Sequence, residues 1–542
     1  MPAPAASPTA ADTARRTRLR AGLRLQAGPA RRGRRFLPLL LAAAAVPMSG
    51  TAAAQAASEA SADPIAQAIR GAVGGKLRDF YRTRGYWPLW IVQGTPGPQA
   101  SALVDIIETV EVDGLDPSRY SPARLRRLID EAQDGDARAN AYLEVALSGA
   151  LADLVRDMRE PHVEIRYLEN QLKPKRARPD EILRRAALAK SMFTYVRTFG
   201  WMNPLYVRLR DALEDAGADS LGEPVEIESG PLLRPGDMGE RVAMLRLRLG
   251  LRDGEAFDDA LAARVRRFQA GRGLPADGIV GPRTVTALNS FASGGPDRRE
   301  LLRLNLERAR LLPDAWTRHI VVDAAAARLW YFGAGAEQGT MRVVVGAKQT
   351  QTPMMAGMVR YATLNPYWNI PVDLVRKRIA PKVLAGTSLK AQGYEVLSDW
   401  THDAEVIDPA SIDWNAVAAG AIEPRVRELP GRGNSMGSVK FMFPNDDGIY
   451  LHDTPQRNLF AKPDRHFSNG CVRLEDAARL GRWMFNRPLK PDGAQPEQHV
   501  PLDEPVPVYL MYFTASPMDE GVRYVADAYG RDEPALQHLA SR

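Results

Sequence analysis

The chain has 542 residues, of which 45% are hydrophobic, 25% are charged and one is cysteine. This length exceeds what one hydrophobic core supports, so about two to four globular domains are expected, and a single cysteine excludes an intrachain disulfide framework. Nine of the 72 Lys and Arg residues but only one of the 65 Asp and Glu residues lie within residues 1–57, which leaves 63 basic against 64 acidic residues elsewhere. The net charge of +7 therefore does not indicate a nucleic-acid-binding surface.

Residues 1–57 have the layout of a secretory signal peptide. An arginine-rich stretch at 31–35 precedes an apolar run at 36–48 and small residues at 52–56. Because the apolar run is shorter than the roughly 20 residues that span a bilayer, a cleaved signal is favoured over an uncleaved inner-membrane anchor. The sequence therefore predicts export to the periplasm, where an unpaired thiol is a liability unless it is buried or has a role.

Residues 58–228 are predicted to form a helical scaffold domain. Apolar residues recur there at three- and four-residue spacing, and the intervening loops are rich in Gly, Pro and Asp. Trp87, Trp90 and Trp201 fit either a carbohydrate groove or a hydrophobic core, and aromatic residues in a helical domain are more often core.

Residues 229–292 form a second predicted module, made of three short helices. Its pattern places Asp237 and Gly239 before the first helix, Phe268 and Gln269 on the second, and Asp277 and Gly278 in the turn before the third. The module resembles the three-helix peptidoglycan-binding domain, with Arg264 where that family usually has Ala. Asp237, Asp277 and Gly278 also have a structural explanation, because tight turns need positive φ and side-chain caps.

After a linker helix within residues 293–317, the composition becomes that of a mostly β domain, residues 318–513. Residues 352–438, rich in Pro, Trp and Tyr, are predicted to be a lid insertion, with a purely structural excursion as the alternative. The polar tail, residues 514–542, is expected to run over the surface. The predicted fold class is multidomain α+β.

Cys471 and His452 are the candidate catalytic pair. His452 follows an apolar run that is typical of a strand, and Cys471 follows a Ser-Asn-Gly turn. A thiol next to an imidazole, a cation such as Arg473 and a helix N-terminus becomes nucleophilic, and the N–H groups of Gly470 and Cys471 are candidates for an oxyanion hole. A buried, unreactive cysteine is the alternative. No metal-ligand spacing is present in the sequence, and no cofactor is predicted.

The stretch resembles the catalytic motif of the L,D-transpeptidases, a strand ending in His followed by [S/T]-x-G-C-[VI]-R. Here the motif is His452 and residues 468–473, and the resemblance to the large periplasmic members extends over about residues 60–535. Many members have His before Gly-Cys, where this chain has Asn469. His452 is therefore the only motif imidazole available as a base, and His466 is interpreted as a loop residue.

The resemblance implies a ping-pong reaction at peptidoglycan stem peptides. Cys471 would attack the third residue of a donor tetrapeptide and release D-Ala, and a meso-diaminopimelate amine would then accept the acyl group in a 3→3 cross-link. The Asp453 carbonyl would orient His452. The resemblance also implies acylation by carbapenems, and other cell-wall synthesis proteins are candidate partners. The candidate substrate-binding residues are Tyr450, Ser468, Asn469, Arg473, Asn434 and Trp368.

Three alternatives remain open at this point. A cysteine hydrolase of stem peptides would share the acyl-enzyme and use water as acceptor, and a related enzyme would attach a protein lysine to peptidoglycan. The third alternative is a non-catalytic scaffold that binds the cell wall.

Overall fold

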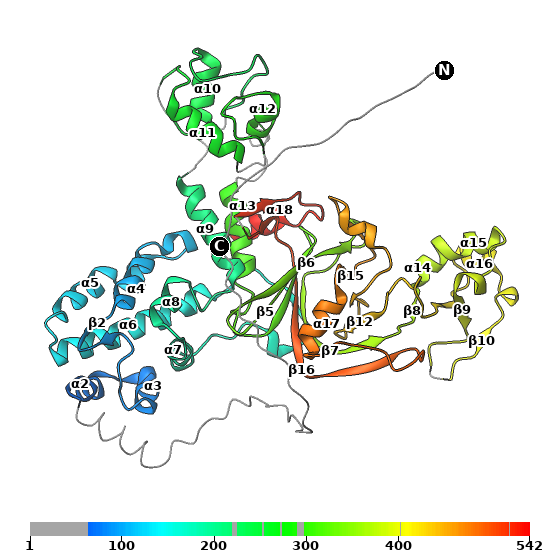
Figure 1. The fold of residues 1–542 in the computed structure, drawn as a ribbon, viewed down its shortest axis with the longest axis horizontal. Coiled ribbons are helices and arrows are strands. Elements are labelled where there is room, and N and C mark those ends of the chain that lie inside the picture. Colours follow the sequence, from blue (N-terminus) through cyan, green and yellow to red (C-terminus); the bar gives the residue numbers. More distant parts are fainter. Residues whose placement is uncertain are drawn as a thin grey trace, which may run out of the picture. The chain divides into compact units, whose positions relative to one another are not determined.

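A computed structural model describes residues 63–218, 225–251, 254–270, 274–289, 298–401, 403–519 and 521–541 (Figure 1). All of them belong to the compact unit Ala57–Arg542. The predicted signal peptide lies outside the described residues, as does Gly273 of the second module. Within the described ranges, no helix is both long and apolar enough to cross a bilayer. The predicted multidomain α+β class is confirmed, with helical elements preceding a mostly β region.

The N-terminal region is a helical array. Its helices are α2 (Pro64–Ala72), α3 (Arg78–Thr83), α4 (Pro98–Glu108), α5 (Pro122–Glu131), α6 (Ala137–Met158), α7 (Pro179–Ala187), α8 (Met192–Arg197) and α9 (Pro204–Ala218). A short hairpin, β1 (Ile91–Val92) with β2 (Thr95–Pro96), lies between α3 and α4. The carboxylates of Asp63 and Asp136 accept N–H bonds in the first turns of α2 and α6, as N-cap residues do.

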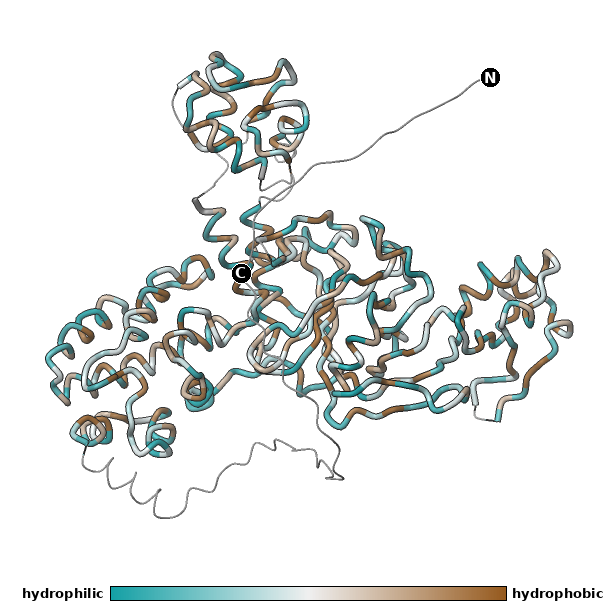
Figure 2. Tube along the Cα trace, viewed as in Figure 1, coloured by the Kyte–Doolittle hydropathy of each residue, from teal (hydrophilic) through white to brown (hydrophobic). Residues whose placement is uncertain are grey.

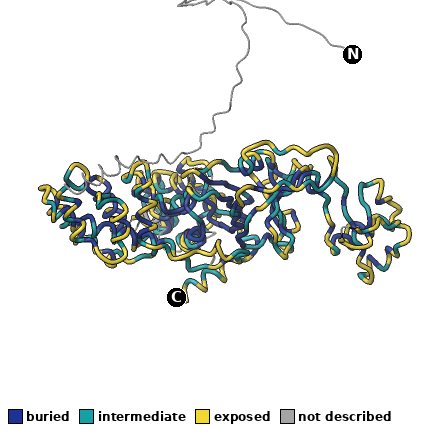
Figure 3. Tube along the Cα trace, turned by 90° about the horizontal axis from the view of Figure 1, so that it is seen from below, coloured by how far each residue is buried: buried dark blue, intermediate teal, exposed yellow. Residues whose placement is uncertain are grey.

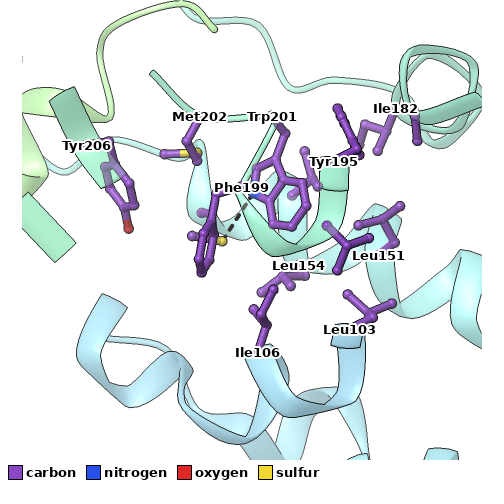
Figure 4. Packing of buried hydrophobic residues seen from close by; sticks show 14 of the residues in the cluster. Leu103, Ile106, Leu151, Leu154, Ile182, Tyr195, Phe199, Trp201, Met202 and Tyr206 are labelled. Atoms are coloured by element: carbon purple, nitrogen blue, oxygen red, sulfur yellow. Dashed lines mark hydrogen bonds between the residues drawn. The ribbon is translucent and has the colours of Figure 1, made fainter. Parts of the chain in front are cut away.

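The scaffold core explains two of its tryptophans. Trp90 and Trp201 are fully or almost fully buried, whereas Trp87 is 40% exposed. Figure 4 shows Trp201 packed among Leu154, Tyr195 and Phe199, with its indole N–H directed to Met158 Sδ at 3.3 Å. Trp90 and Trp201 are therefore core residues, as aromatic residues in a helical domain usually are.

The second module contains α10 (Glu240–Arg248), α11 (Asp259–Ala270) and α12 (Pro282–Asn289). Its own core includes Val242, Leu245, Val265 and Leu288. The motif residues of the module hold its turns. Asp277 accepts from Gln269 Nε2 and Ile279 N–H, both at 2.9 Å, and Gly278 has φ of +78°. Asp237 accepts from Arg234 N–H at 2.7 Å.

A ten-stranded sheet of described residues forms the mostly β domain. Its strands are β3 (Arg166–Tyr167), β4 (His319–Asp323), β5 (Arg328–Gly333), β6 (Ala336–Gly346), β7 (Met355–Leu364), β12 (Val439–Met442), β13 (Leu451–His452), β14 (His466–Ser468), β15 (Val472–Leu474) and β16 (Gln498–Met511). The main path runs β12-β13-β15-β6-β5-β4-β16-β7-β3, and β12 also pairs with β7, so the sheet closes on itself. β3 comes from the scaffold region of the sequence and pairs with β7.

The two faces of this sheet bury different cores. Side chains of β4 point alternately to the two faces. Ile320 and Val322 lie in the core between the strands and α17 (Ala477–Phe485). Val321 lies in the core shared with the scaffold. Helix α13 (Arg298–Ala309) also contributes to the scaffold core. The strands carry long hydrophobic stretches (Figure 2) and are largely buried (Figure 3). The scaffold and the β domain therefore share one hydrophobic core.

The insertion is shorter than predicted. Residues 355–364 were expected within it but form β7 of the main sheet, because their apolar side chains belong to the central core. The inserted segment that was expected to be a lid, residues 366–434, has its own sheet in the order β10-β9-β11-β8 and its own core. Its elements are β8 (Trp368–Asn369), α14 (Val372–Leu374), a π-helical turn (Val375–Ile379), α15 (Ala380–Leu384), β9 (Tyr394–Leu397), β10 (Val406–Ile407), α16 (Trp414–Ala419) and β11 (Arg425–Glu428).

The C-terminal tail is not confined to the surface. It forms β17 (Ala515–Pro517), β18 (Val522–Tyr524) and α18 (Asp532–Ala540). Arg308 of α13 donates to Asp532 at 2.8 Å in a buried ion pair, and Tyr529 is only 6% exposed. The prediction of a tail that runs only over the surface was wrong, because polar and aromatic residues of the tail are buried through contacts with distant parts of the chain, which its polar composition does not indicate.

Candidate active site

Parallel pairing of β13 and β15 brings the candidate residues together. Leu451 lies opposite Val472 and His452 lies opposite Arg473. Leu451 and Val472 point into the core, so the alternation of side chains puts His452 and Arg473 on the other face. Tyr450 and Cys471 lie directly before β13 and β15, two positions before His452 and Arg473, so the alternation puts their side chains on the same face. Val472 N–H donates to Tyr450 O at 2.9 Å. One face of adjacent strands thus presents Tyr450, His452, Cys471 and Arg473.

The thiol of Cys471 is bonded to the main chain and not to the imidazole. Its Sγ donates to Gly448 O at 3.4 Å. Burial raises the pKa of this thiol to about 11, although the Tyr450 backbone and the positive charge of Arg473 lower it. This environment therefore favours the protonated thiol over the thiolate that a cysteine nucleophile requires.

His452 is buried and neutral. Its Nδ1 lies 2.6 Å from Asp453 O, and because a carbonyl only accepts, Nδ1 carries the proton and Nε2 the lone pair. Burial lowers the pKa of His452 to about 4, Arg473 lowers it further, and the Asp453 backbone raises it in part. The imidazole is thus oriented by the carbonyl expected from the sequence and is in the form that can accept a proton.

The turn before Cys471 is held by Ser468. Its Oγ donates to Cys471 O at 2.6 Å and accepts from Gly470 N–H at 3.2 Å. Gly470 has φ of +111°, and a Cβ there would lie 2.8 Å from Ile449 Cδ1, so only glycine fits. Since Ser468 engages the Gly470 N–H, the expected oxyanion role of Gly470 is not supported, and the N–H of Cys471 is the remaining candidate.

Arg473 is the cation of the site. Its Nη1 donates to Gln456 Oε1, while its buried Nε has no partner among the described residues. Burial lowers the pKa of Arg473, and the facing Cys471 opposes that shift. A guanidinium with a buried, unused Nε donor fits a carboxylate ligand, although the bond to Gln456 shows that the side chain also has a structural contact.

Asn434 does not point into the open site. Its side-chain amide donates to Pro366 O, Glu428 O and Leu429 O at 3.2, 3.3 and 2.9 Å, and its Oδ1 accepts from Met436 N–H at 2.7 Å. Only 2% of the residue is exposed. Asn434 therefore ties the two ends of the lid together, and the expected direct contact with substrate is not supported.

The remaining candidates are more accessible. Asn469 is exposed at the tip of the turn, Trp368 is half-buried against the lid core, and Tyr450 is half-buried beside Cys471. Burial and the neighbouring Cys471 raise the pKa of the Tyr450 phenol, so it stays a hydrogen-bond donor. His466 was expected in a loop but begins β14, where it pairs with Val345 of β6 and its ring bonds Asp464 and Ala324 O.

Sequence reasoning missed two threonines that support the turn. Thr350 Oγ1 donates to Ser468 O at 2.9 Å, and Thr352 Oγ1 donates to Gly470 O at 2.7 Å. Each lies 118 residues before its partner, so no local pattern connects them. Pairing of β14 with the end of β6 brings the two segments together.

The comparisons with known proteins agree with this arrangement. Residues 317–494 match the L,D-transpeptidase catalytic domain, residues 75–213 match the scaffold domain, and residues 247–288 match a family described as "Putative peptidoglycan binding domain". A "Putative L,D-transpeptidase" of Haemophilus influenzae is 32% identical over 239 residues, which are 43% of this chain and 48% of that protein. The chain thus matches about half the length of this curated relative.

Two solved structures share low overall similarity with the chain. An L,D-transpeptidase from Mycobacterium smegmatis is 12% identical, covers 36% of this chain and 58% of its own, and has a TM-score of 0.19. The L,D-transpeptidase structure from Xylanimonas cellulosilytica is 16% identical, covers 52% and 98%, and has a TM-score of 0.16. TM-scores this low support no conclusion, whereas the sequence matches relate separate segments of this chain to an L,D-transpeptidase catalytic domain, a scaffold domain and a family described as "Putative peptidoglycan binding domain".

Proposed function

We propose that this protein is a peptidoglycan L,D-transpeptidase that forms 3→3 cross-links through a Cys471 thioester. The main supporting observation is that Cys471 directly precedes β15, where Arg473 lies opposite His452 of β13, and that Arg473 acts on the pKa of both Cys471 and His452. All three residues lie within the segment that matches the L,D-transpeptidase catalytic domain. The substrates are a donor stem tetrapeptide and a meso-diaminopimelate amine as acceptor. Without a motif histidine at position 469, His452 serves as the base.

The first half-reaction forms the acyl-enzyme. The Sγ proton passes to His452 Nε2 as sulfur attacks the carbonyl carbon of the third stem residue. The C–N bond to the terminal D-Ala then breaks, and the leaving amine takes the proton from His452. In the second half-reaction His452 removes a proton from the acceptor amine, the new C–N bond forms, and the C–S bond breaks to restore the thiol.

The neutral forms of Cys471 and His452 limit how this mechanism can begin. With a thiol pKa of about 11 and a His452 pKa of about 4, the thiolate–imidazolium pair is strongly disfavoured before substrate binds. A substrate carboxylate on the free Nε of Arg473 would offset that cation beside His452 and raise the pKa of the imidazole. Because Arg473 also lowers the pKa of Cys471, the same carboxylate would raise the pKa of the thiol, so transfer of the proton from Cys471 to His452 has to accompany attack on the substrate carbonyl.

The lid supports transfer over hydrolysis. Residues 366–434 carry a core of their own and are tied at their base by Asn434, so they can act as a stable cover. A cover that excludes water from a thioester favours attack by an amine. Peptidoglycan substrates also place the site outside the cytoplasm, and the predicted signal peptide supports a periplasmic location. Other cell-wall synthesis proteins are the proposed partners.

The test uses purified tetrapeptide muropeptides with wild type, Cys471→Ala, His452→Ala and the matched control His538→Ala on exposed α18. Mass spectrometry should show 3→3 dimers and released D-Ala with wild type and the control, and neither product with the two site variants. Tripeptide without dimers would instead indicate the hydrolase, and a lysine-bearing acceptor peptide tests protein attachment. Unchanged dimer formation by Cys471→Ala would overturn the cysteine mechanism and favour a wall-binding scaffold.

Acylation by a carbapenem distinguishes the role of Cys471 from that of His452. Cys471→Ala should gain no adduct mass at any pH because it lacks the sulfur. His452→Ala should still acylate at high pH, where hydroxide removes the thiol proton. Adduct formation by Cys471→Ala would place the acylated residue elsewhere.

A further inference from the structure

The C-terminal segment, residues 527–532, is firmly anchored. Asp527 accepts from Tyr512 Oη at 2.7 Å, from Arg531 N–H at 3.0 Å and from Asp532 N–H at 2.8 Å. The Tyr529 ring stacks on Tyr512 with centroids 5.1 Å apart. The Arg531 guanidinium lies against both rings, at 5.1 and 4.8 Å. The segment is therefore a fixed support, although its sequence is that of a polar tail.

This support holds the loop that follows β6. Tyr529 Oη donates to Gly346 O at 2.6 Å, and Arg531 Nη2 donates to Thr352 O at 3.0 Å and to Gln351 Oε1 at 2.9 Å. Gln351 Nε2 returns a bond to Tyr529 O at 3.3 Å. Loop 350–352 is thus bound to the tail by both side chains and main chain.

The same loop holds the turn that presents the thiol. Thr352 Oγ1 accepts from Gly346 N–H at 2.9 Å and donates to Gly470 O at 2.7 Å, while Thr350 Oγ1 donates to Ser468 O at 2.9 Å. Gly470 directly precedes Cys471, and its positive φ makes the turn dependent on outside support. A continuous path of hydrogen bonds therefore joins Arg531 to the residue before the nucleophile.

We propose that Tyr529 and Arg531 are positioning residues for Cys471: they fix loop 350–352, whose threonine hydroxyls fix the turn that carries the thiol. The inference rests on the proposed role of Cys471 as nucleophile. It predicts that substitutions which loosen the tail change the environment of the thiol even where the fold is retained.

A loosened tail should change the rate of the transfer reaction and the rate of thiol alkylation in opposite directions. A displaced turn takes Cys471 out of productive alignment, and misplacement of a reacting group by about 1 Å can cost about 100-fold in rate. The same displacement moves the sulfur from its partly buried bond with Gly448 O towards water, so the thiol ionises more easily. Transfer should slow while alkylation by iodoacetamide becomes faster.

The experiment compares full-length Tyr529→Phe, Arg531→Gln and Thr352→Val. Tyr529→Phe removes the hydroxyl but keeps the stacked ring, and Thr352→Val keeps the shape of the side chain. Thr352→Ser restores the hydroxyl, and Arg523→Gln makes the same charge change at an exposed position of β18. Each variant is measured for kcat and KM of dimer formation, for the iodoacetamide rate against pH, and for Tm and circular dichroism.

The three test variants should lose about tenfold or more in kcat with little change in KM. They should also be alkylated several times faster at about pH 8. Thr352→Ser and Arg523→Gln should behave as wild type. Wild-type kcat and alkylation in folded Tyr529→Phe and Arg531→Gln would overturn the proposal, as would equal changes in Arg523→Gln. If Arg531→Gln does not fold, the result with Tyr529→Phe decides between the outcomes. If wild type shows no transfer, the alkylation rates still test the positioning of Cys471 separately from the proposed function.

Discussion

The Cys471 thiol donates to Gly448 O, while the His452 imidazole on the neighbouring strand is held by Asp453 O. Each partner of the candidate pair is therefore bonded to the main chain of the segment that carries His452. Both groups are neutral in this arrangement, so the site is assembled but not ionised.

Thiol alkylation should report this state directly. Because burial raises the Cys471 pKa to about 11, the iodoacetamide rate should climb about tenfold per pH unit between about pH 7 and pH 10. Adduct mass measured by mass spectrometry gives the rate, with Cys471→Ala as the blank. A plateau near pH 8 would contradict the raised pKa.

Arg473→Gln should shift two pKa values in the same direction. Arg473 lowers the pKa of both Cys471 and His452, so its removal should raise both. Alkylation at about pH 8 should become severalfold slower, because less thiolate is present. The exposed Arg482→Gln on α17 is the charge-matched control and should leave the profile unchanged. Faster alkylation of Arg473→Gln would show that the cation does not act on the sulfur.

Two buried histidines should make the fold sensitive to acid. Burial lowers the pKa of His452 and of His319 to about 4, so between about pH 6.5 and pH 4 the unfolded chain binds protons that the folded chain does not. Stability therefore rises with pH in this window and falls on acidification, by about 3 kcal/mol for each group.

Urea unfolding measured across that window tests this effect. His452→Asn and His319→Asn should each show a shallower loss of unfolding free energy below about pH 6.5 than wild type. His538→Asn, at an exposed position, serves as the control. A wild-type slope in both buried-site variants would mean that carboxylates alone set the acid sensitivity.

Asn434→Ala should loosen the lid. It removes three amide donations to main-chain carbonyls and one acceptance from Met436 N–H, and each hydrogen bond contributes about 0.5–1.5 kcal/mol. Limited proteolysis should cut within residues 366–434 faster than in wild type. Asn415→Ala, exposed on α16 of the same lid, should show wild-type cleavage. Equal cleavage in the two variants would remove the proposed role of Asn434 as a tie.

Much of the fold was predictable because it depends on local patterns. Helical spacing in the described part of residues 58–228, the turn residues of the second module and the strands flanking the insertion predict the type of element found there, although not every helix end, since each reflects periodic burial or turn chemistry. The start of the insertion was not predictable, because β7 is apolar and aromatic in sequence like the lid itself. Its membership of the main sheet depends on pairing with β16 and β12.

The sequence by itself determined the candidate groups of this protein: one cysteine after a Ser-Asn-Gly turn, one histidine at a strand end and a module typical of cell-wall binding. Only the tertiary structure decided how these groups are used. Parallel pairing of β13 with β15 sets His452 opposite Arg473, two positions after Cys471, and burial shifts the pKa values of the thiol and the imidazole towards their neutral forms. The supports of the turn, Thr352 and Arg531, come from distant parts of the chain. A hydrogen bond between such segments depends on how the whole chain packs, which no local stretch of sequence encodes.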